Sequence, residues 1–221
     1  MLPCTPKLFG LLLVFTAMAS AQENYEFLNK NAQLISAAKR NQSDLLERAL
    51  KNGAMPNSRD RSGDTSLNLA ARNGNADMVK LLLAAGANIN QANLEKVTPL
   101  MSAAFQGHAA IVKTLMDKGA DPAATDQSGK TAMVLAAGNG KAEVVKTLLA
   151  SGQNANARYH NDVTALMWAA GNGDVESVAI LLNARADPSL RDNRGKTALA
   201  IARELGHQDI AGLLAAAGAK D

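Results

Sequence analysis

TPLMSAAFQG, residues 98–107, is one of five versions of the same segment in this chain of 221 residues. Each version begins with a threonine, and consecutive threonines are 33 residues apart. Further columns agree, because a Leu or Met, a pair of mostly alanine residues and a glycine follow each threonine at fixed distances. The five threonines are Thr65, Thr98, Thr131, Thr164 and Thr197. This equal spacing indicates one structural unit that is copied along the chain.

Each unit is predicted to contain two short helices. A threonine can cap a helix by accepting a backbone N–H, and Pro99 has the φ that the first helical turn requires. The first helix should end at a glycine such as Gly107, because glycine adopts the left-handed conformation without steric cost. A second segment with helical periodicity, residues 111–116, leads to Gly119 and then to the turn-forming residues 126–129. The repeating unit is therefore a helix, a tight turn, a second helix and an extended turn.

This unit resembles the ankyrin repeat, whose Thr-Pro-Leu-His-x-Ala core is best matched by residues 98–103. The resemblance implies an all-α solenoid of about six helix-turn-helix repeats of 33 residues, with short β-turn fingers between them. A degenerate unit comes first, in which Ala32 replaces the threonine and Asn41 takes the glycine position. The expected parts are an N-terminal cap (22–59), four repeats (60–92, 93–125, 126–158 and 159–191) and a C-terminal cap (192–221).

The first 21 residues have the pattern of a secretory signal peptide. Lys7 precedes the apolar run 8–15, and the small residues 19–21 precede a polar stretch. The apolar part is shorter than the roughly 20 residues of a membrane-spanning helix, although an uncleaved anchor is the alternative. Cleavage after Ala21 would also remove Cys4, the only cysteine, so the mature chain could form no disulfide and use no thiol chemistry. We expect an exported protein, periplasmic in a Gram-negative bacterium or otherwise secreted, without stable membrane insertion.

The sequence contains no pattern that indicates catalysis or a cofactor. It has no G-x-S-x-G, no H-E-x-x-H and no phosphate-binding loop, and the net charge of +3 comes without a basic stripe for nucleic acid. His108 and His207 recur at one repeat position, where the family uses histidine for local hydrogen bonds, so no metal site is expected. The triplets 138–140 and 171–173 contain two glycines each, but their 33-residue spacing assigns them to helix ends.

Departures from the repeat pattern predict the interaction surface. Ankyrin-type arrays bind partners on the concave face and at the turn tips, and large apolar residues here replace polar ones at such positions. Met101 and Met167, for example, stand where the family has histidine, and Phe105 stands in a column that is not apolar. Trp168 could belong either to the core or to the surface. The predicted partner-binding residues are Leu94, Val97, Met101, Phe105, Lys130, Tyr159, His160, Val163, Met167, Arg194 and Lys196.

These features predict a monomeric, non-catalytic module that binds a protein partner whose identity the sequence does not give. One alternative is a self-associating scaffold, because the last helix, 211–217, lacks the polar outer face that capping repeats need. Another is a hydrolytic enzyme that uses His160 and Asp162 of one turn tip. A further departure concerns Arg185, which occupies a glycine column and is expected to have a positive φ.

Overall fold

The computed structural model describes residues 29–220, so the predicted signal peptide lies outside the described residues. The described part is helical, and its only β-type pairing is an isolated antiparallel bridge between Arg59 and Thr65. A helix over residues 29–39 comes first. It is followed by α2 (Ser43–Lys51), α3 (Ser66–Asn73), α4 (Ala76–Ala84), α5 (Pro99–Gln106), α6 (Ala109–Asp117), α7 (Ala132–Ala137), α8 (Ala142–Ala150), the short 3-10 helix η1 (His160–Asp162), α9 (Ala165–Asn172), α10 (Val175–Asn183), α11 (Ala198–Glu204) and α12 (Gln208–Ala216).

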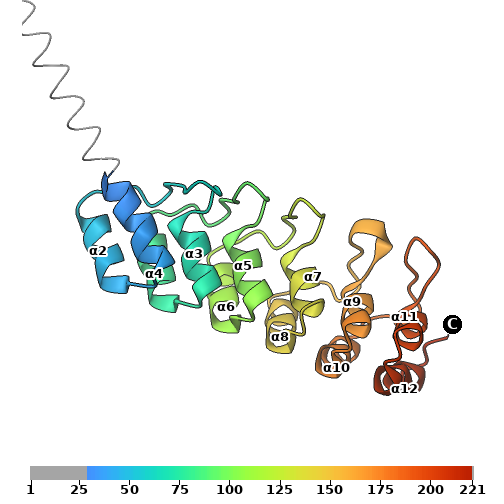
Figure 1. The fold of residues 1–221 in the computed structure, drawn as a ribbon. Helices are drawn as coiled ribbons and strands as arrows, with labels where there is room; N and C mark the ends of the chain where they lie inside the picture. The colour runs from blue at the N-terminus through green and yellow to red at the C-terminus, as the bar shows by residue number, and fades with distance from the viewer. Residues whose placement is uncertain (1–28, 221) are drawn as a thin grey trace, which may run out of the picture.

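The helices form antiparallel pairs that stack side by side in chain order (Figure 1). The first helices of the pairs, α3, α5, α7, α9 and α11, pack against one another in one row, and the second helices, α4, α6, α8, α10 and α12, form another. Small residues allow this close stacking, since the paired alanines of α3, α5, α7 and α9 are completely buried. Each pair therefore completes its core with side chains of its neighbours, as expected for a solenoid.

The five threonines occupy equivalent places, as the period predicts. Each one precedes a first helix in an extended conformation, and its side-chain oxygen accepts the backbone N–H three residues later. The distances between these N and O atoms run from 3.1 Å at Thr197 to 3.5 Å at Thr131. The predicted capping role is therefore confirmed for all five threonines.

The extended turns between the pairs form five fingers, residues 60–64, 93–97, 126–130, 159–163 and 192–196. Each finger is closed by a backbone hydrogen bond of 3.0 Å, which its first residue donates to the carbonyl oxygen of its fifth. Neighbouring fingers are also joined, by N–H groups of Leu94, Gln127 and Asn193 that bond to carbonyl oxygens of the preceding finger. Within the described residues, no backbone hydrogen bond of this kind joins the finger 126–130 to the finger 159–163. The row of fingers is thus interrupted once.

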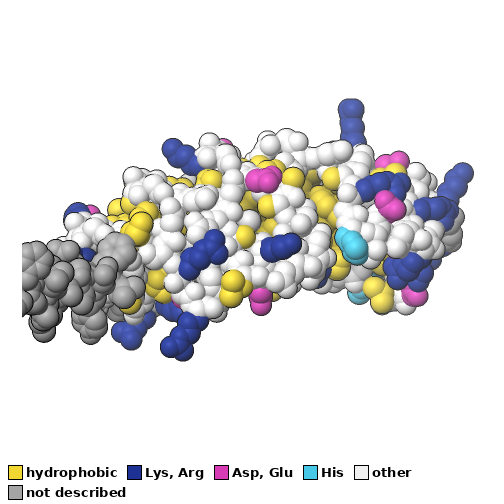
Figure 2. All heavy atoms as spheres, turned by 90° about the horizontal axis from the view of Figure 1, so that it is seen from above, with side chains coloured by type: hydrophobic (Ala, Val, Ile, Leu, Met, Phe, Trp, Pro, Cys, Tyr) yellow, Lys and Arg dark blue, Asp and Glu magenta, His cyan; other side chains and the backbone are white. Residues whose placement is uncertain are grey.

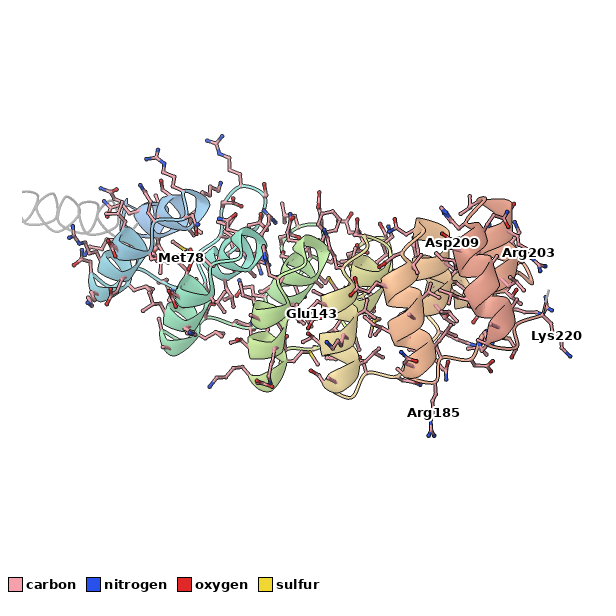
Figure 3. All side chains as sticks on the ribbon, turned by 90° about the horizontal axis from the view of Figure 1, so that it is seen from below. Met78, Glu143, Arg185, Arg203, Asp209 and Lys220 are labelled. Carbon is pink, nitrogen blue, oxygen red and sulfur yellow. The ribbon has the colours of Figure 1, made fainter. Side chains whose placement is uncertain are left out.

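The second helices end where the sequence predicts, and Arg185 has the predicted positive φ. Gly119 and Gly152 have φ values of 85° and 89°, and Arg185 takes the same conformation at 61°. Figure 3 shows the Arg185 side chain extending away from the helices. A left-handed conformation costs a residue with a Cβ atom roughly 1 kcal/mol. The unit 159–191 therefore carries local backbone strain.

Replacing Arg185 with glycine is expected to raise the free energy of unfolding by about 0.5 kcal/mol, because part of the relief is offset by the greater freedom of glycine in the unfolded chain. Urea unfolding followed by circular dichroism measures this change. The matched reverse variant is Gly152→Arg, since a Cβ atom at Gly152 would meet no atom within 4 Å. This variant should lose a similar amount, and an Arg185→Gly protein that is no more stable than the parent would contradict the strain.

Candidate partner-binding surface

The predicted site residues belong to the fingers and to the first helices. We call the exposed surface of the first helices, together with the fingers, the inner face. Viewed onto the fingers, the surface shows hydrophobic side chains emerging between the finger backbones, with Lys, Arg, Asp and Glu side chains among them (Figure 2). An exposed mixture of apolar and charged groups of this kind is typical of surfaces that contact proteins.

In the repeat 93–125, Leu94 and Phe105 are the most exposed large apolar side chains of the inner face. Leu94 is 64% exposed on the finger 93–97, and Phe105 is 46% exposed near the end of α5. The exposure predicted for Phe105 is therefore confirmed. Val97 closes the same finger and is half-buried against the core. These residues project from a finger and a helix whose backbones are fixed by hydrogen bonds.

Met101 and Met167 were predicted to lie on the partner-binding surface, but the structure buries both. They are 1% and 2% exposed. Each occupies the third position of its helix, and its Sδ atom accepts the N–H of the capping threonine, at 3.5 Å for Thr98 and 3.4 Å for Thr164. The thioether therefore turns back toward the helix N-terminus and away from solvent, as one half of a capping box. Both residues therefore stabilise first helices and do not present an exposed side chain.

Tyr159 changes the finger 159–163. In the other fingers, an Asp or Asn at this position accepts two N–H groups of the finger, as Asp126 does from Ser128 and Lys130. Tyrosine cannot do so, and Asn161 and Asp162 adopt left-handed φ values of 62° and 58°. Burial raises the pKa of the half-buried Tyr159 hydroxyl, although a hydrogen bond with Thr131 lowers it in part.

The outer end of the same finger carries His160, which is exposed. A Cβ atom at Gly129 would lie 3.2 Å from its Cβ atom, so His160 stands beside the preceding finger. The ring is therefore available on the inner face, as the sequence predicts. Asp162, its partner in the alternative catalytic hypothesis, is also exposed and lies 3.7 Å from Arg158.

Trp168 is half-buried, so it is both a packing residue and a surface residue. The ammonium group of Lys130 lies 5.1 Å from the centre of the Trp168 ring, within the range of a cation–π interaction. Lys130 comes from the finger 126–130 and Trp168 from α9, so this contact links two units. Val163 packs beside it and is likewise half-buried.

Arg194 and Lys196 lie on the last finger. Arg194 donates from Nε and Nη2 to the completely buried carboxylate of Asp192, at 3.0 and 2.7 Å, while its side chain remains 62% exposed. Lys196 forms an ion pair with Glu204 at the end of α11. The Asp192 carboxylate thereby fixes the position of a guanidinium group whose outer edge faces solvent.

A groove on the inner face brings several of these side chains together. It lies between α7, α9 and α11 and has a volume of about 320 Å³. Val163, Met167 and Arg194 of the predicted set reach it, whereas Leu94 and Phe105 do not. The residues that line it are Gly138, Val163, Met167, Trp168, Gly171, Asn172, Arg194, Ile201 and Leu205.

Gly138, Gly171, Ile201 and Leu205 line the groove but were not among the residues predicted from the sequence. The two glycines were interpreted only as helix ends, but they occupy the column that holds Arg72, Phe105 and Glu204 in other units. Two successive glycines in a column of large side chains were the signal that could have revealed an opening at this point.

The model of the family described as ankyrin repeats (3 copies) matches residues 11–93, 34–126, 86–159 and 133–221. The chain belongs to the ankyrin-repeat family. No curated protein matches it significantly. The matches correspond to about four repeats, so the predicted number of about six repeats was too high for this ankyrin-repeat protein. The terminal units explain the difference, because Ala32 replaces the capping threonine at one end and Arg203 replaces an alanine of the buried pair at the other.

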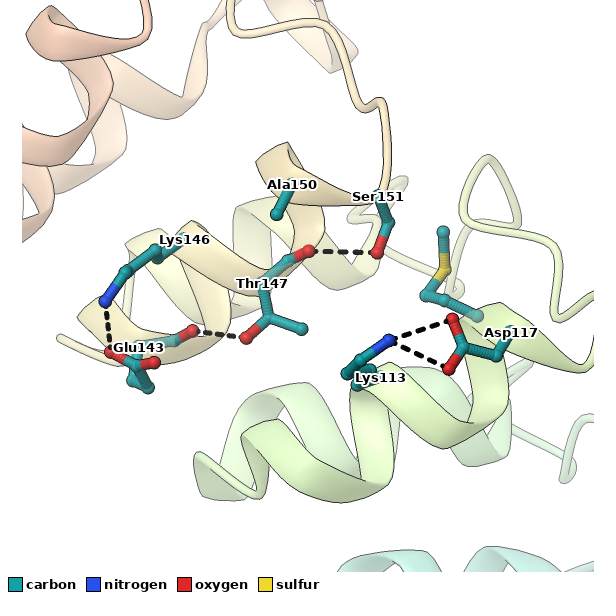
Figure 4. A pocket seen from close by; sticks show the side chains of 8 residues that line it. Lys113, Asp117, Glu143, Lys146, Thr147, Ala150 and Ser151 are labelled. Atoms are coloured by element: carbon teal, nitrogen blue, oxygen red, sulfur yellow. Dashed lines mark hydrogen bonds and ion pairs between the residues drawn. The ribbon is translucent and has the colours of Figure 1, made fainter.

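The second helices of this ankyrin-repeat protein border another cavity, of about 380 Å³, between α6 and α8 (Figure 4). Its charged residues neutralise one another in pairs. Lys113 lies 2.9 Å from Asp117, and Lys146 lies 3.4 Å from Glu143. These exposed pairs follow the helix spacing of three or four residues and stabilise single helices. The inner face also has charged pairs, such as Arg194 with Asp192 and Lys196 with Glu204, but it combines them with exposed apolar side chains.

The recurring histidines act between repeats. Nε2 of His108 lies 3.1 Å from the Arg72 carbonyl oxygen, and Nε2 of His207 lies 3.3 Å from that of Gly171. Each ring therefore ties the start of one second helix to the first helix of the preceding unit. Among residues 29–220, no three His, Cys, Asp or Glu side chains are grouped to hold a metal ion. No helix in this range is long and apolar enough to cross a membrane.

Proposed function

We propose that this ankyrin-repeat protein is an exported, non-catalytic module that binds another protein through its inner face and fingers. The observation that carries the proposal is the gathering of exposed apolar side chains and positioned cationic groups on one side of the stacked helix pairs. Ankyrin repeats are in general protein-interaction modules, which supports a protein as the partner. Aromatic and aliphatic residues would supply most of the affinity, and Lys130, Arg194 and Lys196 would favour an acidic partner.

Export is the second part of this proposal, and it rests on residues 1–21. A short apolar run after Lys7 and small residues before position 22 support cleavage by a signal peptidase. Mass spectrometry of the protein recovered from the extracytoplasmic fraction of its own cells tests this. An intact leader on protein found only in the cytosol would refute export without affecting the binding proposal.

Affinity capture from the native compartment tests binding. A Leu94→Ser, Phe105→Ser variant is expected to recover at least tenfold less of the partner than the parent does, corresponding to about 1.4 kcal/mol or more. Both side chains are exposed, so their loss should leave the unfolding midpoint nearly unchanged. The matched control is Leu45→Ser, Val175→Ser, which removes two exposed apolar side chains from second helices. Equal recovery of one partner by all three proteins would contradict the inner-face assignment.

Self-association is a second candidate, favoured by the last unit. Leu213 is exposed, as are the alanines 215–217 at the end of α12. Sedimentation velocity across a range of protein concentrations separates the two functions. A monomer at every concentration supports a module that binds a different protein. A dimer that dissociates in the Leu213→Lys variant supports the self-associating scaffold.

A further inference from the structure

Gly171 keeps the inner-face groove open although the fold does not require glycine there. Its φ lies outside the left-handed region, and it is part of α9. A Cβ atom would meet Cγ2 of Ile201 at 3.4 Å and Cδ1 of Leu205 at 3.8 Å, which are ordinary contact distances. Alanine would therefore fit and would favour the helix. A side chain at position 171 would fill the space between Trp168 and α11.

The walls of this space are apolar and partly exposed. Trp168 and Ile201 are half-buried, and Leu205 is 56% exposed. The volume of about 320 Å³ lies at the lower end of the range of ligand pockets, about 300 to 1,000 Å³. It thus suits one large side chain better than a whole cofactor. The groove runs between two neighbouring first helices, which favours an extended segment that places this side chain between them.

The charges at the groove are cationic. Arg194 is the only charged residue among its lining side chains, and Lys130 lies over the Trp168 ring at its edge. The nearby acidic groups are already engaged, since Asp192 is buried under Arg194 and Glu204 pairs with Lys196. Because Asp192 binds Arg194 through Nε and Nη2, the remaining edge of the guanidinium can receive a second carboxylate. A partner segment with an acidic residue therefore complements this rim.

We propose that the groove between α9 and α11 binds a linear segment of a protein partner, with one large aliphatic side chain between Trp168 and Leu205 and a neighbouring carboxylate on Arg194. This inference rests on the proposed function and names the chemistry of the bound segment. It adds Gly171, Ile201 and Leu205 to the residues that the sequence predicted.

A phage-displayed library of random linear peptides, selected on the full chain, tests the proposal. Enriched peptides are expected to share a large aliphatic residue next to Asp or Glu. Trp168 is the only tryptophan, so its fluorescence reports directly on the groove, and a bound synthetic peptide should shift its emission. Replacing the aliphatic residue of that peptide with alanine should weaken binding at least tenfold. Replacing its acidic residue should weaken binding to the parent more than to Arg194→Gln.

Two substitutions separate filling of the groove from damage to the fold. Gly171→Leu should reduce peptide affinity at least tenfold, while Gly171→Ala should raise the Tm by about 2 °C and reduce affinity less. The matched control is Gly212→Ala in α12, where a Cβ atom meets nothing within 4 Å. It should raise the Tm similarly and leave peptide binding unchanged.

The outcomes distinguish this inference from the proposed function. Peptides that bind without shifting Trp168 emission, and that bind Gly171→Leu as tightly as the parent, would overturn the groove and leave partner binding intact. A library that yields no peptide would overturn a linear segment as the occupant. If the parent chain forms a dimer and the Gly171→Leu variant is monomeric, a second copy of the chain occupies the groove, which would also overturn the proposal. If only the Leu94→Ser, Phe105→Ser variant recovers as much partner as the parent does, the assignment of the whole inner face as the binding surface would be overturned and the groove would remain.

Discussion

Replacing Gly173 with alanine is expected to lower the free energy of unfolding by about 3 kcal/mol. Two effects add. Gly173 has a φ of 78°, which alanine adopts at a cost of about 1 kcal/mol. The new Cβ atom would also lie 2.8 Å from Cε1 of His207, so the imidazole must move and its 3.3 Å contact with the Gly171 carbonyl oxygen is lost. Overpacking of this kind costs about 1 to 3 kcal/mol.

Gly206→Ala is the matched control for this experiment. Gly206 ends α11 with a φ of 80°, but a Cβ atom there would meet nothing within 4 Å. Only the backbone cost of about 1 kcal/mol is therefore expected. Urea unfolding of both variants, with the slope of the transition compared, measures the difference. Equal losses in the two proteins would show that the histidine contact between repeats contributes nothing.

Replacing Asp192 with alanine is expected to cost about 2 kcal/mol near neutral pH, because several hydrogen-bond donors lose a buried carboxylate. Its Oδ1 atom accepts the N–H groups of Arg194 and Lys196, each at 2.9 Å, and Oδ2 accepts the Arg194 guanidinium. This loss is smaller than for a fully buried ion pair, because the arginine side chain is largely exposed.

The same substitution should change how stability depends on acid. Burial alone would raise the Asp192 pKa, but the hydrogen bonds from Lys196 and Arg194 outweigh it, and the pKa lies below 3.8 in the folded protein. Between the two values the unfolded chain binds more protons, so this stabilisation is present above about pH 3.8 and lost as the pH falls toward the folded pKa.

Unfolding in urea at pH values from about 5 to about 2.5 measures the acid effect. Asp192→Ala should lose less stability than the parent over this window. Asp126→Ala is the control, since Asp126 accepts the same two N–H groups of its finger and is only half-buried. Parallel curves for the parent and Asp192→Ala would contradict the role assigned to this carboxylate.

The regular part of the fold could be predicted because it depends on local chemistry. A threonine that caps a helix and a glycine with positive φ act through their own backbone, so their spacing predicts the ends of α3, α5 and α9. The first helix of the unit 126–158 is an exception, because α7 ends at Ala137, three residues before Gly140. Arg185 follows the same rule, since the geometry of its position is set by the repeat. The family matches corrected only the number of full repeats.

The candidate site was predicted less well, because exposure depends on where a side chain turns. Met101 was placed on the surface because the family has a polar residue in its column, yet its thioether accepts a hydrogen bond from the capping threonine. The groove was missed for a different reason. Gly171 contributes to it by lacking a side chain, and such a gap becomes visible only once Trp168 and Leu205 are placed around it.

The interruption in the row of fingers separates them into two groups. Within each group a backbone hydrogen bond joins neighbouring fingers, whereas none of the described residues forms such a bond between the fingers 126–130 and 159–163, where the His160 side chain stands beside Gly129. The helices still pack across this boundary, α7 against α9 and α8 against α10. The fingers 126–130 and 159–163 are therefore expected to shift relative to each other more easily than other neighbouring fingers, and such a shift would alter the distance between Lys130 and Trp168.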